Sequence, residues 1–297
     1  MMNTSKYDVI VAGAGPAGIC AAVAAARQGA RVALIERYGV VGGNLTAGYV
    51  GPILGSVGKN TMRDEVCALL GVPDNDWIGE HGKAHDFEEA KLVLAEFIAR
   101  ERNIDVFLQC CVSGVIQKGN VVKGIQCASN EGPLRFEAPV TIDCTGDAIV
   151  SFLAGAEIQK GRSSDGLMQP VTLEYTIDGV DESKGLICIG DVDNVQLNGE
   201  RFLDWCKKRA DEGKLPPLLA AVRLHPSVRP GCRQVNTTQA NGVDITLTGS
   251  IFAADLALRQ QIRLLTRFLQ ENLPGYENCR VIGSGATTGV RESRRVM

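Results

Sequence analysis

Short apolar segments alternate with helical patterns along the first half of the chain. Residues 8–12 are apolar and β-branched, as in a buried parallel strand, and residues 17–28 are rich in alanine without proline, as in a helix. Residues 31–36 repeat the strand pattern. Residues 85–102 show apolar positions at helical spacing, which are Phe87, Ala90, Leu94, Phe97 and Ile98. We therefore predict an α/β fold that begins with a parallel sheet.

Later segments predict a β-meander and then a second domain. Extended stretches are expected at 104–108, 112–116, 120–127 and 135–144. The pattern changes at the polar turn that begins at Gly161, after which strand alternation over 171–177 and helices at about 200–212 and 252–272 are expected. We predict a first domain over 1–158, a second, α+β domain over 159–278, and a segment over 279–297 that returns toward the first domain.

The turn between the first strand and the first helix carries a glycine motif. It reads Gly13-Ala14-Gly15-Pro16-Ala17-Gly18, and the second strand ends in Glu36. Gly13 permits a tight turn, Gly15 lets the backbone approach a pyrophosphate, and Gly18 lets the helix pack on the strand. The helix N-terminus stabilises the phosphates, and Glu36 can accept hydrogen bonds from a ribose 2′-hydroxyl, which favours FAD or NAD over NADP. This context favours a Rossmann-like dinucleotide site over an ordinary strand-to-helix turn.

Length, charge and hydropathy narrow the class of protein. A chain of 297 residues with 45% hydrophobic and 22% charged residues is typical of a soluble globular protein of two domains. The net charge of −3 argues against nucleic acid as the main partner. No apolar run approaches the ~20 residues that span a bilayer, and no signal pattern precedes the first strand. We therefore expect a cytoplasmic protein without a membrane span.

Cysteines and histidines give no sign of a disulfide framework or a metal site. The ten cysteines are scattered except for Cys110-Cys111, and no Cys-x-x-Cys occurs, so buried thiols are expected, with both members of the pair in an apolar strand. His81, His85 and His225 lack metal-ligand spacing, so no metal is predicted. His81 and His85 precede the expected helix, where capping or solvent exposure is the favoured role.

Further motifs follow the glycine motif in a familiar order. These motifs are Gly42-Gly43-Asn44-Leu45-Thr46, then Ile142-Asp143-Cys144-Thr145-Gly146-Asp147-Ala148, then Gly161-Arg162 with Asp165-Gly166-Leu167-Met168-Gln169-Pro170, and Gly289-Val290-Arg291-Glu292-Ser293-Arg294-Arg295. With them the chain resembles, over nearly its whole length, the FAD-dependent oxidoreductases of the glutathione-reductase-like flavoprotein superfamily. The resemblance implies that the dinucleotide is FAD.

The resemblance also assigns cofactor contacts. In the family, the Thr145-Gly146-Asp147 element lies at a strand end beside the pyrophosphate and ribityl region. Val112 would meet the adenine through its backbone, or it is a core valine. Together with the glycine motif, the residues expected at the cofactor are Gly13, Gly15, Pro16, Ala17, Gly18, Glu36, Arg37, Gly43, Asn44, Thr46, Val112, Thr145, Gly146 and Asp147.

A bound flavin would carry the electron or hydride chemistry itself, so no protein nucleophile is required. The resemblance places five polar candidates near the domain junction, and these are Arg162, Asp165, Gln169, Arg291 and Arg294. An arginine there could hold a carboxylate substrate or stabilise a reduced, anionic flavin. A structural salt bridge is the equally weighted alternative.

The chain departs from the family pattern at its end. Family members continue beyond the Arg-Glu-x-Arg-Arg segment to a stretch that closes over the flavin, whereas this sequence ends at Met297. We expect a fragment of a longer protein, and the alternative is weak or absent FAD binding. The favoured function is an FAD-dependent oxidoreductase acting on an unidentified small organic substrate with an unidentified electron acceptor or donor. A non-catalytic flavin-binding module of a larger assembly and an NAD-dependent dehydrogenase without flavin stay open.

Overall fold

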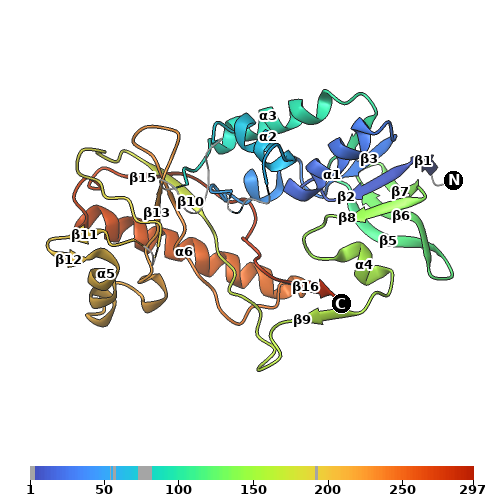
Figure 1. The fold of residues 1–297 in the computed structure, drawn as a ribbon. Coiled ribbons are helices and arrows are strands. Elements are labelled where there is room, and N and C mark those ends of the chain that lie inside the picture. Colours follow the sequence, from blue (N-terminus) through green and yellow to red (C-terminus); the bar gives the residue numbers. More distant parts are fainter. Residues whose placement is uncertain (1–3, 54, 56–57, 73–81, 191–192) are drawn as a thin grey trace. The chain divides into compact units, whose positions relative to one another are not determined.

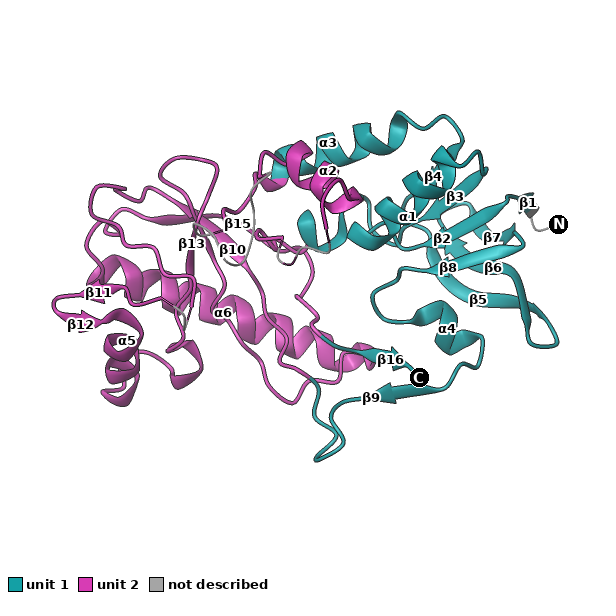
Figure 2. Ribbon diagram, in the orientation of Figure 1, with its two compact units in different colours: residues 1–47, 88–168, 292–297 teal, residues 48–87, 169–291 magenta. Residues whose placement is uncertain are grey.

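The computed structural model describes residues 4–297 except 54, 56–57, 73–81 and 191–192. The chain forms two compact units, each assembled from separate stretches of sequence (Figure 2). Unit 1 comprises residues 1–47, 88–168 and 292–297, and unit 2 comprises residues 48–87 and 169–291. The predicted division at residues 158 and 278 stays a prediction. The units differ from it chiefly in residues 48–87, which belong to unit 2.

Unit 1 is built around a parallel sheet with the strand order β4-β3-β2-β8 (Figure 1). Its strands are β2 (Val9–Ala12), β3 (Val32–Ile35), β4 (Ile104–Phe107) and β8 (Val140–Asp143). Helix α1 (Pro16–Arg27) connects β2 to β3 and packs against both. Strand β3 is buried at every position, as expected of a parallel strand that is covered on both faces.

A second sheet in unit 1 contains the predicted meander. Its order is β1-β7-β6-β5, formed by β1 (Thr4–Lys6), β5 (Cys111–Lys118), β6 (Val121–Ser129) and β7 (Gly132–Glu137). Strands β5, β6 and β7 are antiparallel neighbours, and β1 adds parallel to β7. One core cluster holds residues from both sheets, including Ile10 and Ile35 from the first and Ile125 and Phe136 from the second. The expected combination of a parallel sheet with a β-meander is therefore confirmed.

The remaining elements of unit 1 lie around these sheets. They are η1 (Gly43–Leu45), α3 (Phe87–Ala99, whose first residue falls in unit 2), α4 (Ile149–Leu153), β9 (Ile158–Lys160) and β16 (Arg294–Val296). Strands β9 and β16 pair in antiparallel fashion. The predicted amphipathic helix is confirmed within narrower bounds, since all five of its predicted apolar positions are buried.

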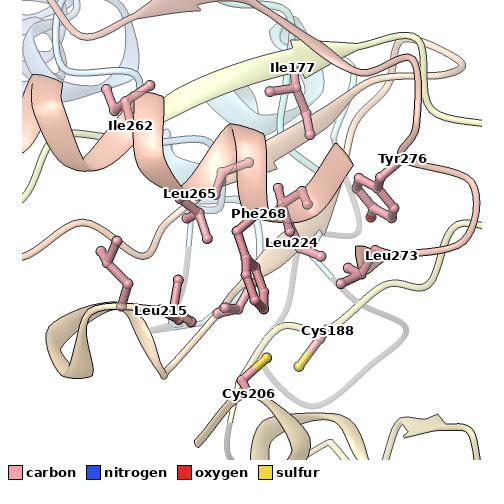
Figure 3. Close-up of a cluster of buried hydrophobic side chains, with 14 of the residues drawn as sticks. Ile177, Cys188, Cys206, Leu215, Leu224, Ile262, Leu265, Phe268, Leu273 and Tyr276 are labelled. Carbon is pink, nitrogen blue, oxygen red and sulfur yellow. The ribbon is translucent and has the colours of Figure 1, made fainter. Parts of the chain in front are cut away.

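Unit 2 is an α+β unit, as predicted, built on an antiparallel sheet and a long helix. The sheet order is β13-β14-β10-β15, with β10 (Tyr175–Asp178), β13 (Leu224–Pro226), β14 (Arg233–Val235) and β15 (Arg280–Ser284). Helix α6 (Thr248–Asn272) packs on one face of this sheet, where Leu265 and Phe268 share a core cluster with Ile177 and Leu224 (Figure 3). The other elements are α2 (Met62–Leu69), β11 (Gln196–Leu197), β12 (Glu200–Arg201), α5 (Phe202–Asp211) and η2 (Pro217–Leu219).

Ala84, in the described part of residues 48–87, pairs with the backbone at and just after β13. The backbone N–H of Ala84 donates to the carbonyl of Pro226 (2.8 Å), and the N–H of Val228 donates to the carbonyl of Ala84 (2.9 Å). Gly51 lies directly against Ala84, since a Cβ added at Gly51 would stand 2.4 Å from the Ala84 Cβ. Among all the helices that the structure describes, none has the length and apolar character needed to cross a bilayer.

Candidate functional site

The carboxyl ends of three parallel strands bring the predicted site residues together in unit 1. Gly13 follows β2, Glu36 follows β3, and Thr145 lies two residues beyond β8. Strand β2 has β3 on one side and β8 on the other, so the chain connections diverge there (Figure 1). In open α/β sheets such a topological switch point is where ligands bind, outside the carboxyl ends of the strands.

The glycine motif is packed against its own sheet at two positions and open at the third. Gly13 has φ +98° and donates its N–H to the carbonyl of Ile35 (2.7 Å). A Cβ at Gly18 would lie 1.7 Å from the carbonyl oxygen of Gly13, so this position admits only glycine. At Gly15, by contrast, an added Cβ would meet no atom within 4 Å. Open space beside the first turn of α1 is the cradle that a pyrophosphate needs.

Glu36 holds the glycine turn through hydrogen bonds to the backbone. Its side chain is buried, and its two oxygens accept the N–H of Ala14 (2.7 Å) and the N–H of Tyr38 (2.9 Å). A carboxylate has about four lone-pair sites, so each oxygen retains capacity for a ribose hydroxyl. The sequence interpretation assigned Glu36 only to the ribose. It missed the backbone contacts because Ala14 lies 22 positions away in the chain.

The loop that follows Glu36 lies on the glycine motif. Gly42 has φ +104° and donates its N–H to the carbonyl of Ala14 (2.8 Å), and a Cβ at Gly43 would stand 2.9 Å from the Cα of Gly15. Asn44 is exposed, whereas Thr46 is fully buried and its hydroxyl donates to the carbonyl of Val41 (2.6 Å). Of these two predicted contacts, Asn44 therefore has the side chain available to a ligand.

The Thr145-Gly146-Asp147 element forms a braced turn at the end of β8. Asp143 accepts hydrogen bonds from the hydroxyl of Thr145 (2.7 Å) and from its N–H (3.2 Å), and Gly146 has φ +77°. Asp147 is buried and forms an ion pair with Arg37 (3.2 Å). Two predicted cofactor residues, 110 positions apart, are thus in direct contact.

Val112 and Arg294 lie at the margins of this site. Val112 is half-buried in β5, opposite Cys127, and Cys110 donates its N–H to the carbonyl of Glu36 (2.9 Å). Val112 therefore lies two residues along the chain from Cys110, which is bonded to the Glu36 backbone. Both predicted roles of Val112, the adenine contact and the core valine, stay open. Arg294 donates to the carbonyl of Asp147 (3.2 Å) and lies over the ring of Phe152 (4.5 Å), so it supports the turn after β8.

The five catalytic candidates divide between the units. Arg162, Asp165 and Arg294 belong to unit 1, and Gln169 and Arg291 are exposed residues of unit 2. Arg162 and Asp165 form a bidentate salt bridge (2.7 and 2.6 Å), and these hydrogen bonds lower the pKa of Asp165 to about 2. Because each charge is already matched by its neighbour, the structural alternative fits Arg162 and Asp165 better than a catalytic role.

Two local expectations were wrong. His85 is not exposed: it is buried, its Nδ1 lies 3.0 Å from the carbonyl of Gly51, and its ring contacts Phe87 edge-on. Its predicted partner, His81, lies outside the described residues. Cys111 is exposed, because β5 turns alternate side chains outward, whereas Cys110 is buried. None of the ten cysteines forms a disulfide, and seven are buried. Within the described ranges, no group of His, Cys, Asp or Glu is arranged to hold a metal ion.

Sequence reasoning missed a buried carboxyl group in unit 2. Glu174 directly precedes β10 and is only 5% exposed. Burial raises its pKa to about 8, although the charges of Arg291 and Arg223 act in the opposite direction. The alternation over 171–177 places Glu174 and Thr176 on the same face of a strand whose other face is apolar, but it does not indicate that the polar face is covered.

A parallel sheet with a glycine motif at its switch point, an acidic residue after the second strand and a braced turn after β8 define a Rossmann-type flavoprotein. The model of the FAD dependent oxidoreductase family matches residues 8–297, and the chain belongs to this family. Its cofactor is accordingly FAD, and the open space at Gly15 fits a pyrophosphate.

Known proteins that resemble the chain are redox enzymes of several kinds. A thiamine thiazole synthase from Pyrococcus horikoshii is 26% identical over 181 residues, which cover 57% of this chain and 69% of that protein. A soluble pyridine nucleotide transhydrogenase from a Marinomonas species is 30% identical over 158 residues, or 49% of this chain and 32% of that protein. The crystal structure of p-nitrophenol 4-monooxygenase PnpA from Pseudomonas putida matches with a TM-score of 0.57 at 13% identity, over 99% of this chain and 69% of that one. This last likeness shows the fold.

Proposed function

We propose that unit 1 holds the adenosine and pyrophosphate parts of FAD at the ends of β2, β3 and β8, and that the bound flavin oxidises or reduces a small organic substrate. The observation that carries this proposal is the open space over Gly15, bordered by Gly43 and by the first turn of α1. N–H groups of that turn would face the pyrophosphate, and Glu36 would accept the ribose hydroxyl.

The residues of this chain have supporting roles in that chemistry. A bound flavin supplies the hydride or electron transfer. Glu36 orients the glycine turn through Ala14, and the pair of Arg37 and Asp147 ties the segment after β3 to the turn after β8. Because this ion pair joins two strand ends, it keeps both sides of the proposed cradle at a fixed separation. Arg294 donates a hydrogen bond to the carbonyl of Asp147 and so stabilises the turn after β8.

Several finer expectations remain part of the proposal. The chain spans about a third of the transhydrogenase that it matches and about two thirds of the thiazole synthase, so the substrate and electron acceptor of the whole protein stay open. Membership of the glutathione-reductase-like superfamily, a missing C-terminal part and a cytoplasmic location stay predictions from the sequence. A non-catalytic flavin-binding module is the second candidate, since none of the comparisons identifies a substrate.

The purified chain tests the cofactor and the activity separately. A yellow protein with a flavin absorbance band, which releases FAD rather than FMN on denaturation, supports the cofactor site. Bleaching of that band by a candidate donor supports an enzyme, and a band that dithionite bleaches but no candidate donor changes supports a passive module. A colourless protein that takes up no added FAD and shifts NADH fluorescence would contradict the proposal in favour of a nicotinamide dehydrogenase.

A further inference from the structure

The sheet of unit 2 has one apolar face and one polar face. Tyr175, Val235 and Leu224 lie in register on β10, β14 and β13, and all three belong to the core cluster under α6. Side chains alternate across a strand, so their neighbours point to the other face. The next row of the register, Thr176, Gln234 and His225, lies on that opposite face.

Glu174 and Arg223 extend this polar face by one further row. Glu174 is two residues before Thr176, and Arg223 is two residues before His225. Asn236, which directly follows β14, lies in the same row, and its N–H donates to the carbonyl of Arg223 (3.2 Å). The polar face therefore brings a carboxyl, a hydroxyl, an amide and a guanidinium group together from three adjacent strands.

The polar face is covered, yet three of its polar atoms have no hydrogen-bond partner among the described residues. Glu174, Thr176 and Gln234 are 5%, 8% and 0% exposed. The atoms without a partner are Oε2 of Glu174, Oγ1 of Thr176 and Oε1 of Gln234. A polar atom that is removed from water and left without a hydrogen bond destabilises the folded protein. Three such atoms on one face of one sheet indicate a place where a ligand supplies the missing hydrogen bonds.

Tyr49 and the segment around Gly283 and Gly285 cover part of this face. Tyr49 accepts a hydrogen bond on its carbonyl from Nε2 of Gln234 (3.3 Å), and its hydroxyl lies against Gly283 of β15. The N–H of Gly285 donates to the carbonyl of Glu174 (3.0 Å). Tyr49 stacks on Phe87, with ring centroids 4.4 Å apart. Tyr49 is thereby packed from two sides and covers part of the polar face.

The charges around Glu174 favour an anionic ligand. Arg223 and Arg291 both act on Glu174, but the burial of the carboxyl outweighs them and raises its pKa to about 8. At neutral pH the carboxyl is therefore mainly protonated and does not neutralise the charge of the two arginines. Among the described residues, further titratable or charged groups near this face include His225 on β13, Tyr49 and His85 from the covering segment, and Arg259 of α6, which donates to Ser284 and to the carbonyl of Gly285.

We propose that the polar face formed by Glu174, Thr176, Gln234 and Arg223 binds a small hydroxy acid. The protonated Glu174 donates to the carboxylate of the ligand, Arg223 and Arg291 neutralise its charge, and Oε1 of Gln234 accepts from the hydroxyl group beside it. These residues all belong to unit 2, so the assignment does not depend on the cofactor site proposed in unit 1.

The test measures the binding of lactate to the FAD-loaded protein by calorimetry between pH 6 and pH 10 in carboxylate-free buffer. We expect a dissociation constant that is constant below pH 8 and rises about tenfold for each pH unit above it, because Glu174 must then take up a proton on binding. Propionate lacks the hydroxyl and should bind at least about threefold more weakly. Lactamide, which is uncharged, should show no such pH dependence.

Variants assign the effect to Glu174. Glu174→Gln should abolish the rise above pH 8, and Thr176→Val and Arg223→Met should weaken lactate binding at every pH by about tenfold. His225→Gln and His85→Gln keep the rise if it belongs to Glu174, and the exposed Glu212→Gln is the matched control. Far-ultraviolet circular dichroism of each variant reports whether it is folded.

Two outcomes would overturn the inference. The first is an FAD-loaded protein that binds no lactate at any pH, which would mean that water alone supplies the missing hydrogen bonds of the polar face. The second is lactate binding that Glu174→Gln and Thr176→Val leave unchanged. The FAD content of each sample keeps the two proposals apart: a protein that binds lactate with the expected pH dependence but takes up no FAD supports this site and contradicts the cofactor site.

Discussion

An added methyl group should reduce stability at Gly18 and cofactor affinity at Gly15, the two roles of the glycine motif. In Gly18→Ala the new Cβ would stand 1.7 Å from the carbonyl oxygen of Gly13, whereas ordinary contact begins at 3.4 Å. The obstructing atom is backbone and cannot rotate away. Gly13 is also held by its own hydrogen bond to Ile35 (2.7 Å). Helix α1 must therefore move outward, at a cost of about 1–3 kcal/mol for the overpacked contact and about 1 kcal/mol for a weakened hydrogen bond.

Gly15→Ala should leave stability almost unchanged and lower the affinity for FAD. An added Cβ meets no atom within 4 Å, and φ −71° with ψ −175° is a conformation that alanine adopts readily. The free energy of unfolding of the FAD-free protein should therefore change by less than about 0.5 kcal/mol. The methyl group does occupy the space proposed for the pyrophosphate, so FAD affinity should fall by at least about tenfold, equivalent to about 1.4 kcal/mol.

Two measurements on FAD-free protein decide between these expectations. Urea unfolding followed by circular dichroism gives the free energy of unfolding, and quenching of flavin fluorescence on titration gives the FAD affinity. Gly249→Ala, at an open position in α6, is the control that leaves FAD affinity unchanged. A Gly18→Ala variant as stable as the parent chain, or a Gly15→Ala variant that binds FAD as tightly, would refute the reasoning.

Three further outcomes are expected. Glu36→Gln should lower the free energy of unfolding by about 1–3 kcal/mol, because its amide nitrogen cannot accept the N–H of Ala14 or Tyr38; urea unfolding of FAD-free protein measures this, and no change would count against the backbone role. Glu174 binds its proton more tightly in the folded protein, so stability should decrease from pH 4.5 to pH 8 by up to about 5 kcal/mol and then level off, and Glu174→Gln should remove this loss; urea titrations across pH test it, and a pH-independent difference between the two proteins would contradict it. Phe268→Ala should destabilise the chain by about 3–5 kcal/mol, and a change in thermal unfolding below 1 kcal/mol would show that Phe268 is not a core residue.

The elements and the outline of the cofactor site could be predicted because they depend on neighbours in sequence. Alternation over 171–177 and helical spacing over 85–102 each reflect one buried face, and the structure forms a strand over Tyr175–Asp178 and a helix over Phe87–Ala99. The glycine motif is equally local, since the clash between Gly18 and Gly13 joins residues only five positions apart. Physical constraints that act within one turn leave a pattern that a single sequence displays.

The contacts that could not be predicted join distant parts of the chain. The ion pair between Arg37 and Asp147 spans 110 positions, and no periodicity encodes it. The burial of Glu174 depends on residues 48–87 crossing into unit 2, where Tyr49 covers the sheet. A glutamate in an alternating strand normally faces water, so the pattern alone favoured an exposed side chain.

The interleaving of the two units has a consequence for how the chain folds. Unit 1 is completed only when β16 pairs with β9, an association in which Val296 meets Ile158. The parallel pair of β2 and β8 likewise joins Val9 to Val140. The long chain segments between these paired strands close slowly, because chain entropy is lost before any contact stabilises the strand pair. During synthesis the dinucleotide site therefore forms only after β8 has been made, although its glycine turn is among the first segments to leave the ribosome. Added FAD should accelerate only those refolding steps that follow the docking of β8.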